Sequence, residues 1–404
     1  MFHCFFVRAT RVVCRISRIF PLVAVLMLLT GPLLYGTRAH AAPPTMDDLA
    51  ALNDKLIQTS VGYGDIPSLY RPRYGQAADM DLSMDKQEPV FVVMLPNGPH
   101  IYPQRIMVWH QVVNELIDDI AYAITYCPIT GCLAAYVSGL NGLNLLLDAD
   151  GRLYDGNSVL IDRNTGSLWL QILGMSFDGQ LMGRGLNMLP VFWTTWSAAY
   201  SQFPDAKVLV PPPGSKRSYY RDPYGDYLKK DSYYFNDTLI YPVRFINRDL
   251  PRKNPVQGYE IDGYELAIDI TYVKKMGAVN FFMGDLPLVA VHDKKLDVVR
   301  LYNRQIWDKP SLFVMKNNEF LDIATQTKWD AATGKAVSGA MTGASMPQYY
   351  GIYSMWFAWY DLHPSTLLIP GKGEVPQNLL QITPLDQDPL VGIPPVSTPA
   401  PKQP

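Results

Sequence analysis

Residues 162–166 read Asp-Arg-Asn-Thr-Gly, residues 330–334 read Asp-Ala-Ala-Thr-Gly, and each stretch opens a matched series of residues. Gly183 to Trp196 and Gly343 to Trp356 are both 13 positions, and a proline follows each tryptophan after 8 more. In this alignment the first copy carries an insertion at 167–174. A repeat of this length indicates duplication of a domain-sized unit, because solenoid repeats span only about 20 to 50 residues. We expect module copies at 88–213 and 240–371, joined by a linker at 214–239.

The local patterns within each copy are mostly those of strands. Short β-branched or alternating apolar runs are separated by Gly, Pro, Asn or Asp, which is typical of β-structure; in the first copy they are Pro89–Leu95, Ile120–Tyr126, Leu133–Val137, Leu143–Leu147, Ser158–Asp162 and Ser167–Leu173. Two helices are expected there, at Gln104–Ile117 and Thr194–Gln202. The sequence therefore predicts a mainly β fold with a few short helices (α+β), built as a tandem duplication of one β-rich module.

The chain ends have a different composition. Four arginines between positions 8 and 18 precede an apolar run, Phe20–Leu34, and then Ala39-His40-Ala41. This order is that of a secretory signal peptide at 1–41, cleaved between Ala41 and Ala42. The apolar run is short for a spanning helix, which needs about 20 residues, so a retained anchor is the less favoured alternative. Residues 42–87 are expected to form a helix, Thr45–Ser60, and a loop segment, and 372–404 a Pro-rich tail.

The bulk composition excludes several classes of protein. Of the 404 residues, 48% are hydrophobic, which excludes global disorder. The net charge of −2 gives no basic patch for nucleic acid. After cleavage we expect no membrane span, a periplasmic or secreted location, and an envelope partner of unknown identity.

The sharpest local feature is Cys127-Pro-Ile-Thr-Gly-Cys132, which lies between two predicted strands. It is expected to form a four-residue hairpin loop with one cysteine at each end. Opposed residues at such a position have Cα atoms about 4.5–5.5 Å apart, which a disulfide can bridge. The pair could form a structural disulfide, a redox-active one, or, with His110 of the preceding predicted helix, a soft-metal site for copper or zinc.

The second copy lacks this chemistry. His292 and Asp293 fall where Tyr126 and Cys127 fall, and neither cysteine of the first copy has a cysteine as its counterpart. No Gly-x-Ser-x-Gly elbow, P-loop or His-Glu-x-x-His helix occurs anywhere in the chain. The aromatic group around Trp193 and Trp196 is interpreted as core, with a carbohydrate platform as the alternative.

Several ordered motifs resemble the domain of unknown function 3179 family: Ile124-Thr-Tyr-Cys127-Pro-Ile-Thr-Gly131, Asp162-Arg-Asn-Thr-Gly166-Ser-Leu-Trp169, and Thr194-Thr-Trp196 with Phe203-Pro204. The resemblance covers about residues 90 to 370. It implies a commonly exported bacterial or archaeal protein without a settled activity, and the selenoproteins among its members suit a redox role. In relatives the position of Cys132 often holds a small residue, which makes Cys127 and His110 the pair to test.

These observations favour a periplasmic thiol-redox or copper-type binding protein that uses Cys127 and Cys132, with His110 as a further metal ligand. The alternative is a non-catalytic envelope binding or scaffold protein with a structural Cys127–Cys132 disulfide. Whether the protein is an enzyme stays open at this point, and its cofactor is unknown, with copper or none as the expectation.

Overall fold

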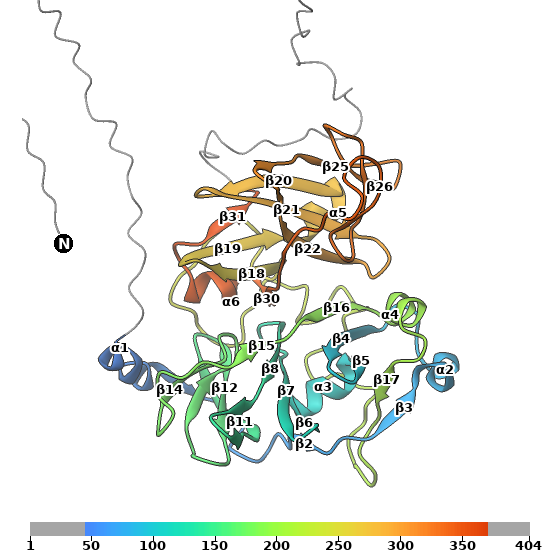
Figure 1. The fold of residues 1–404 in the computed structure, drawn as a ribbon. Coiled ribbons are helices and arrows are strands. Elements are labelled where there is room, and N and C mark those ends of the chain that lie inside the picture. The colour runs from blue at the N-terminus through green and yellow to red at the C-terminus, as the bar shows by residue number, and fades with distance from the viewer. Residues whose placement is uncertain (1–44, 371–404) are drawn as a thin grey trace, which may run out of the picture. The chain divides into compact units, whose positions relative to one another are not determined.

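The computed structural model describes residues 45–370, and within them the fold is mainly β with six short α-helices (Figure 1). The predicted mainly β fold with a few short helices is therefore confirmed, whereas the tandem duplication stays a prediction. The signal peptide at 1–41, its cleavage site at Ala41–Ala42 and the tail at 372–404 lie outside the described residues. None of the helices within 45–370 has the length and apolar character needed to cross a bilayer.

The N-terminal segment begins with a short helix, α1 (Met46–Ala50), which Thr45 caps. The Thr45 hydroxyl accepts the backbone N–H of Asp48, and the Asp48 carboxylate accepts that of Thr45. The predicted helix over 45–60 was too long: after a 3₁₀ turn at Asn53–Lys55, residues Leu56–Gln58 form strand β1. Pairing with β11 supplies hydrogen bonds to this stretch, and it overrides the helical spacing of the leucines. The remaining elements here are β2 (Leu69–Tyr70), β3 (Tyr74–Gln76), α2 (Ala77–Met80) and a 3₁₀ turn at Asp81–Ser83.

The first module consists of strands and two short helices. They are β4 (Pro89–Leu95), β5 (Gly98–Pro103), α3 (Gln104–His110), β6 (Val112–Ile117), β7 (Ile120–Cys127), β8 (Cys132–Val137), β9 (Gly139–Leu140), β10 (Leu143–Asn144), β11 (Leu147–Tyr154), β12 (Asn157–Asp162), β13 (Leu168–Leu170), β14 (Met175–Asp178), β15 (Asn187–Met188), β16 (Val191–Thr195), α4 (Trp196–Gln202) and β17 (Lys207–Leu209). Some of these strands form two five-stranded sheets with β1 and β3 of the N-terminal segment, in the orders β1-β11-β12-β13-β14 and β16-β4-β5-β17-β3.

The second module repeats this order of elements. It consists of β18 (Pro255–Ile261), β19 (Tyr264–Asp269), α5 (Ile270–Met276), β20 (Ala278–Met283), β21 (Leu286–Asp293), β22 (Val298–Asn303), β23 (Gln305–Ile306), β24 (Lys309–Pro310), β25 (Phe313–Lys316), β26 (Glu319–Asp322), β27 (Lys328–Asp330), β28 (Lys335–Ser338), β29 (Gln348–Tyr349), β30 (Ile352–Met355), α6 (Trp356–Leu362) and β31 (Leu367–Ile369). Both modules open with two strands and a helix, and both close with a strand, a helix and a short strand.

The turn after β12 corrects the predicted alignment of the two parts of the chain. Asp162 accepts the backbone N–H of Thr165 at 2.6 Å, and in the second module Asp322 accepts that of Thr325 at 2.7 Å. The counterpart of Asp162 is thus Asp322, eight positions before Asp330, and 167–174 is not an insertion. The sequence alignment failed because residues 322–326 read Asp-Ile-Ala-Thr-Gln, without the final glycine. The complete Asp-x-x-Thr-Gly pattern occurs in the second module only at the next turn, residues 330–334.

Two glycines support the corrected alignment. A Cβ at Gly174 would lie 2.4 Å from the Tyr136 ring, and a Cβ at Gly334 would lie 2.6 Å from the Tyr302 ring. Tyr136 on β8 and Tyr302 on β22 occupy equivalent places, because each lies one residue before the end of its strand. Each module therefore packs a turn glycine with positive φ against a tyrosine at the equivalent position of its strand.

One nine-stranded sheet contains strands of both modules. Its order is β2-β6-β7-β8-β30-β18-β19-β31, with β15 also paired to β8. The junction is β8 with β30, where Leu133 lies opposite Tyr353. Figure 1 shows β30 of the second module beside β8 and β15 of the first. The cysteine hairpin β7–β8 is thus held between the rest of its own module and the second module.

The first predicted helix was also too long, because only Gln104–His110 is helical. Gln111 has φ 57°, its backbone N–H bonds to the Met107 carbonyl at 2.7 Å, and the chain turns from there into β6. The run Val112–Ile117 then pairs with β7 along its whole length. The second expected helix, Thr194–Gln202, begins later, at Trp196, because Thr194 and Thr195 belong to β16 and Thr195 caps α4.

An irregular segment connects the modules. No helix or strand is assigned from 210 to 254, a longer stretch than the predicted linker at 214–239. Residues 216–254, which we term the tyrosine segment, are nonetheless packed against the modules. Tyr219, Tyr233 and Tyr234 in it are buried, so this part of the chain contributes to the core.

Candidate functional site

The two cysteines face each other at the ends of a four-residue turn, as the sequence predicted. Cys127 ends β7, Cys132 begins β8, and the two are direct partners in the ladder. Gly131 adopts φ 59°, a left-handed conformation that glycine tolerates. Both cysteines are free thiols and completely buried. The disulfide stays a prediction, since opposed positions of this kind allow one to form.

A buried polar network holds the cysteine turn. The Asn157 amide donates to the Thr130 hydroxyl at 3.1 Å and to the Gln171 side-chain oxygen at 2.9 Å. The Asn157 oxygen accepts the backbone N–H of Ile172 at 3.1 Å, and Gln171 donates to the Thr125 hydroxyl at 2.9 Å. Because all these groups are buried, each bond stabilises a polar atom that would otherwise lack a partner.

The surroundings of the thiols keep Cys132 protonated at neutral pH. Burial raises the pKa of the Cys132 thiol well above its ordinary value, and the neighbouring Cys127 adds to the effect. The hydrogen-bonding side chains of Gln171 and Asn157 lower this pKa, but only partly offset burial. A thiol reacts and binds metal as the thiolate, so Cys132 is weakly reactive in this folded state.

His110 does not join the cysteines. Its Nδ1 lies 2.7 Å from the Pro67 carbonyl oxygen and its Nε2 lies 2.8 Å from the Tyr219 hydroxyl. A carbonyl can only accept, so Nδ1 carries the proton and Nε2 accepts from Tyr219. Burial lowers the pKa of His110, which favours this neutral form.

A metal site formed by His110 and both cysteines is not assembled here. Within residues 45–370 no three His, Cys, Asp or Glu side chains are grouped so that they could hold a metal ion. The helix α3 ends at His110 and directs this side chain to the N-terminal segment and the tyrosine segment. The spacing in the sequence could not show this, because both partners of the imidazole are distant in the chain.

At the positions of the two thiols, the second module has a carboxylate in an ion pair and an apolar residue. Asp293 and Val298 are ladder partners on β21 and β22, as Cys127 and Cys132 are on β7 and β8. The buried Asp293 carboxylate pairs with Arg300 at 2.9 Å. The expected positional match of Asp293 with Cys127 is therefore consistent with the ladder, and the thiol pair occurs only in the first module.

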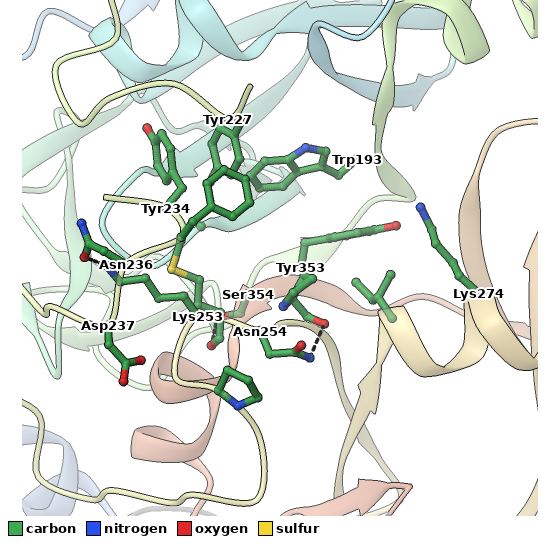
Figure 2. Close-up of a pocket in the computed structure, with 16 residues that line it drawn as sticks. Trp193, Tyr227, Tyr234, Asn236, Asp237, Lys253, Asn254, Lys274, Tyr353 and Ser354 are labelled. Atoms are coloured by element: carbon green, nitrogen blue, oxygen red, sulfur yellow. Dashed lines mark hydrogen bonds between the residues drawn. The ribbon is translucent and has the colours of Figure 1, made fainter. Parts of the chain in front are cut away.

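A cavity of about 420 Å³ lies beside the cysteine turn, and Gly131 forms part of its wall. Figure 2 shows Tyr227, Tyr234 and Trp193 together on one side, with Tyr353 and Lys253 across the cavity from them. The lining comes from β16, the tyrosine segment, α5 and β30, and therefore from both modules. Figure 2 also draws apolar side chains of this wall; those in the lining are Phe235, Pro251, Pro255, Ile270 and Met355.

The aromatic wall has a defined geometry. Tyr227 and Tyr234 stack with ring centroids 3.6 Å apart, and Trp193 meets the Tyr227 ring edge-on at 5.1 Å. Trp193 also contacts Tyr126 of the cysteine strand at 5.7 Å and Tyr353 of β30 at 6.3 Å. Trp193 thus connects the cavity, the cysteine hairpin and the second module.

Sequence reasoning missed this site. Trp193 was assigned to the core and the tyrosine segment to a linker, and neither Tyr353 nor Lys253 was singled out. The available signal was the density of tyrosines between 216 and 237, which is unusual for an exposed linker.

A family model described as "Protein of unknown function (DUF3179)" matches residues 63–366. No curated protein and no solved structure matches the chain.

Proposed function

This chain belongs to the DUF3179 family of proteins of unknown function, and from that premise we propose that it is an exported binding protein whose ligand occupies the aromatic cavity. The observation that carries the proposal is the wall of Trp193, Tyr227, Tyr234 and Tyr353 around about 420 Å³. Cavities of about 300–1,000 Å³ with mostly apolar walls and a few polar groups are the usual form of a small-molecule site.

The wall is ordered before any ligand arrives. Trp193 lies on β16, which is paired to β4 over its whole length, and its ring is packed against Phe91 and Tyr126. Tyr234 is buried and donates to the Asp222 carboxylate at 2.8 Å. Binding then costs little conformational entropy, because the side chains that would contact the ligand are already fixed.

A binding titration with matched tryptophan variants tests this function. The panel consists of two-ring aromatic molecules, charged and uncharged, and of maltose. We expect at least one member of this panel to bind the purified chain saturably. Trp193→Ala should abolish that binding, while Trp307→Ala should not, since Trp307 is 72% exposed and lies outside the lining. The proposal is wrong if nothing on the panel binds, or if both variants behave alike.

Export and duplication belong to the same proposal. Residues 8–42 contain a basic region, an apolar run and a cleavage motif of small residues, in the order found in signal peptides. The order of helices and strands is the same in both modules, which supports a tandem duplication. Intact mass of the protein recovered from the periplasmic fraction should correspond to a chain starting at Ala42. A full-length mass, or recovery from the cytoplasm alone, would contradict export.

Thiol-redox or copper-type chemistry at Cys127 and Cys132 is the second candidate function. The observation in its favour is their direct opposition across β7 and β8, which suits reversible disulfide formation. With both His110 nitrogens engaged, copper would have to be held by the two thiolates alone, a soft donor pair suited to Cu(I). Both thiols are buried, so a redox partner or metal would reach them only after the turn opens.

Mass and metal analysis of the same protein, with and without reductant, tests this candidate. A redox or copper function predicts a mass change of two hydrogens under mild reductant, or one Cu(I) bound per chain, with both lost in Cys127→Ser. A metal-free protein with no Cu(I) uptake and a bond that resists mild reductant would instead indicate a structural disulfide, which is the scaffold role expected as the alternative.

A further inference from the structure

We infer that the cavity selects an uncharged, planar aromatic molecule, an inference that rests on the proposed binding function. The argument comes from what the cavity wall leaves free. Aromatic and apolar side chains line most of the cavity, while its cationic groups and most of its hydrogen-bonding groups are already engaged within the protein.

The first cation of the wall, Lys253, is saturated. Its ammonium donates to the Thr238 carbonyl at 2.6 Å and to the Asn236 side-chain oxygen at 3.2 Å, and also to the Tyr233 carbonyl. These three acceptors use all three of its donors. The ammonium also lies 3.4 Å from the Tyr233 ring centroid. Figure 2 shows the bond from Lys253 to Asn236.

The second cation, Lys274 of α5, is paired with Asp297 at 2.8 Å. The remaining charged group of the lining is Asp237, which is exposed and would repel an anion. An anionic ligand would therefore meet no free cation. A cationic ligand would meet only the exposed Asp237 carboxylate, whose charge the Lys253 ammonium already offsets.

Most of the uncharged polar groups are engaged as well, and an exception is the Tyr353 hydroxyl, which is buried without a hydrogen-bond partner. The Asn254 amide donates to Asp269 at 2.9 Å, and the Ser354 hydroxyl donates to the Met355 carbonyl at 3.2 Å. The Asn236 oxygen accepts from Thr238 and Lys253. A sugar needs several protein partners for its hydroxyl groups, and it would lose hydrogen bonds to water on entering such a cavity.

The arrangement of the aromatic rings in the cavity wall suits a ligand with a flat ring system. Trp193 stands at 74° to Tyr227 and at 37° to Tyr353, so the three rings form a corner rather than a closed stack. Aromatic rings prefer offset-stacked or edge-to-face contacts with centroids about 4.5–7 Å apart. A planar ligand can stack on one ring of this corner while its edge meets another.

Isothermal titration of the full chain with a matched series tests the inference. Four members share a two-ring carbon skeleton and separate charge from planarity: 2-naphthol, naphthalene-2-sulfonate, N,N,N-trimethyl-2-naphthylammonium and trans-2-decalol. Maltose, which is larger, is the sugar of the series. We expect 2-naphthol to bind at least tenfold more tightly than every other member. Equal or tighter binding of any other member would overturn the inference and leave the binding function standing. Binding of none would overturn both.

Three variants that keep an apolar or aromatic side chain locate the binding and guard against misfolding. Trp193→Leu keeps an apolar side chain without a flat face and should weaken 2-naphthol at least tenfold, whereas Trp193→Phe should stay within threefold of the wild type. Tyr353→Phe keeps the ring and should also stay within threefold. Equal affinities of the Leu and Phe variants would overturn the inference, provided that both show the thermal midpoint of the wild type.

Discussion

Replacing Asn157 by alanine tests whether the buried network around the cysteine turn stabilises the first module. Asn157 is 2% exposed and makes three hydrogen bonds, to Thr130, Gln171 and the backbone of Ile172. A buried hydrogen bond contributes about 1 kcal/mol net, and a partner left unsatisfied costs about 1–3 kcal/mol. Asn157→Ala orphans the Ile172 N–H and the Gln171 oxygen, so we expect a loss of about 3–4 kcal/mol in the free energy of unfolding.

The assay is equilibrium unfolding in urea under reducing conditions, on the chain from Ala42 onward, in which the cysteines are Cys127 and Cys132. The matched control is Asn187→Ala, because Asn187 is exposed on β15 and such surface changes usually cost less than about 0.5 kcal/mol. A second readout is the rate of thiol labelling in native buffer, which should rise at least tenfold because the turn covers both buried cysteines. A loss below about 1 kcal/mol, or equal losses for the two variants, would refute this account of the turn.

Three further predictions concern other buried groups. Burial raises the pKa of Glu115 from 4.5 to about 7, so its contribution to stability is full below pH 4.5 and is lost as the pH rises through 7. Glu115→Gln should remove up to about 3 kcal/mol of that pH dependence in unfolding curves at pH 5 and 8, and an unchanged slope would contradict the assignment. Gly258→Ala places a Cβ 2.2 Å from the Trp359 ring and should cost about 1–3 kcal/mol by thermal unfolding, whereas a neutral result would show that the ring moves freely. Arg300→Met leaves the Asp293 carboxylate buried without its partner and should cost about 3–5 kcal/mol, most of it recovered when Asp293→Leu is added; a double variant as unstable as the single one would argue against this ion-pair explanation.

The proposed binding role also changes how the cysteine pair is viewed. The turn that the cysteines flank contributes Gly131 to the cavity wall, and its Thr130 carbonyl accepts the Met355 backbone N–H at 2.8 Å. Met355 lines the same cavity. A structural disulfide at the ends of this turn would therefore hold this part of the cavity wall in place. A redox-active disulfide would instead make the geometry of the wall depend on the oxidation state of the cysteines.

Local sequence determined much of the fold. The Cys127–Cys132 turn was predictable because proline and glycine between two apolar runs specify a hairpin, and a hairpin places its end residues opposite each other. The Thr45 cap followed from an equally short-range rule. Family membership was also readable from the sequence, since the motifs at Cys127, Asp162 and Trp196 keep their order, and the family model over 63–366 confirms it.

Only the tertiary structure decided which side chains meet. His110 is bonded to Pro67 and Tyr219, which lie 43 and 109 positions away. The cavity joins Trp193, Tyr227 and Tyr353 from three separate elements. The helix predicted through Ile117 became β6, because its pairing with β7 outweighs helical spacing. Periodicity and turn chemistry act over a few residues, whereas a binding site is made by contacts between segments far apart in the chain, and these depend on how the sheets pair.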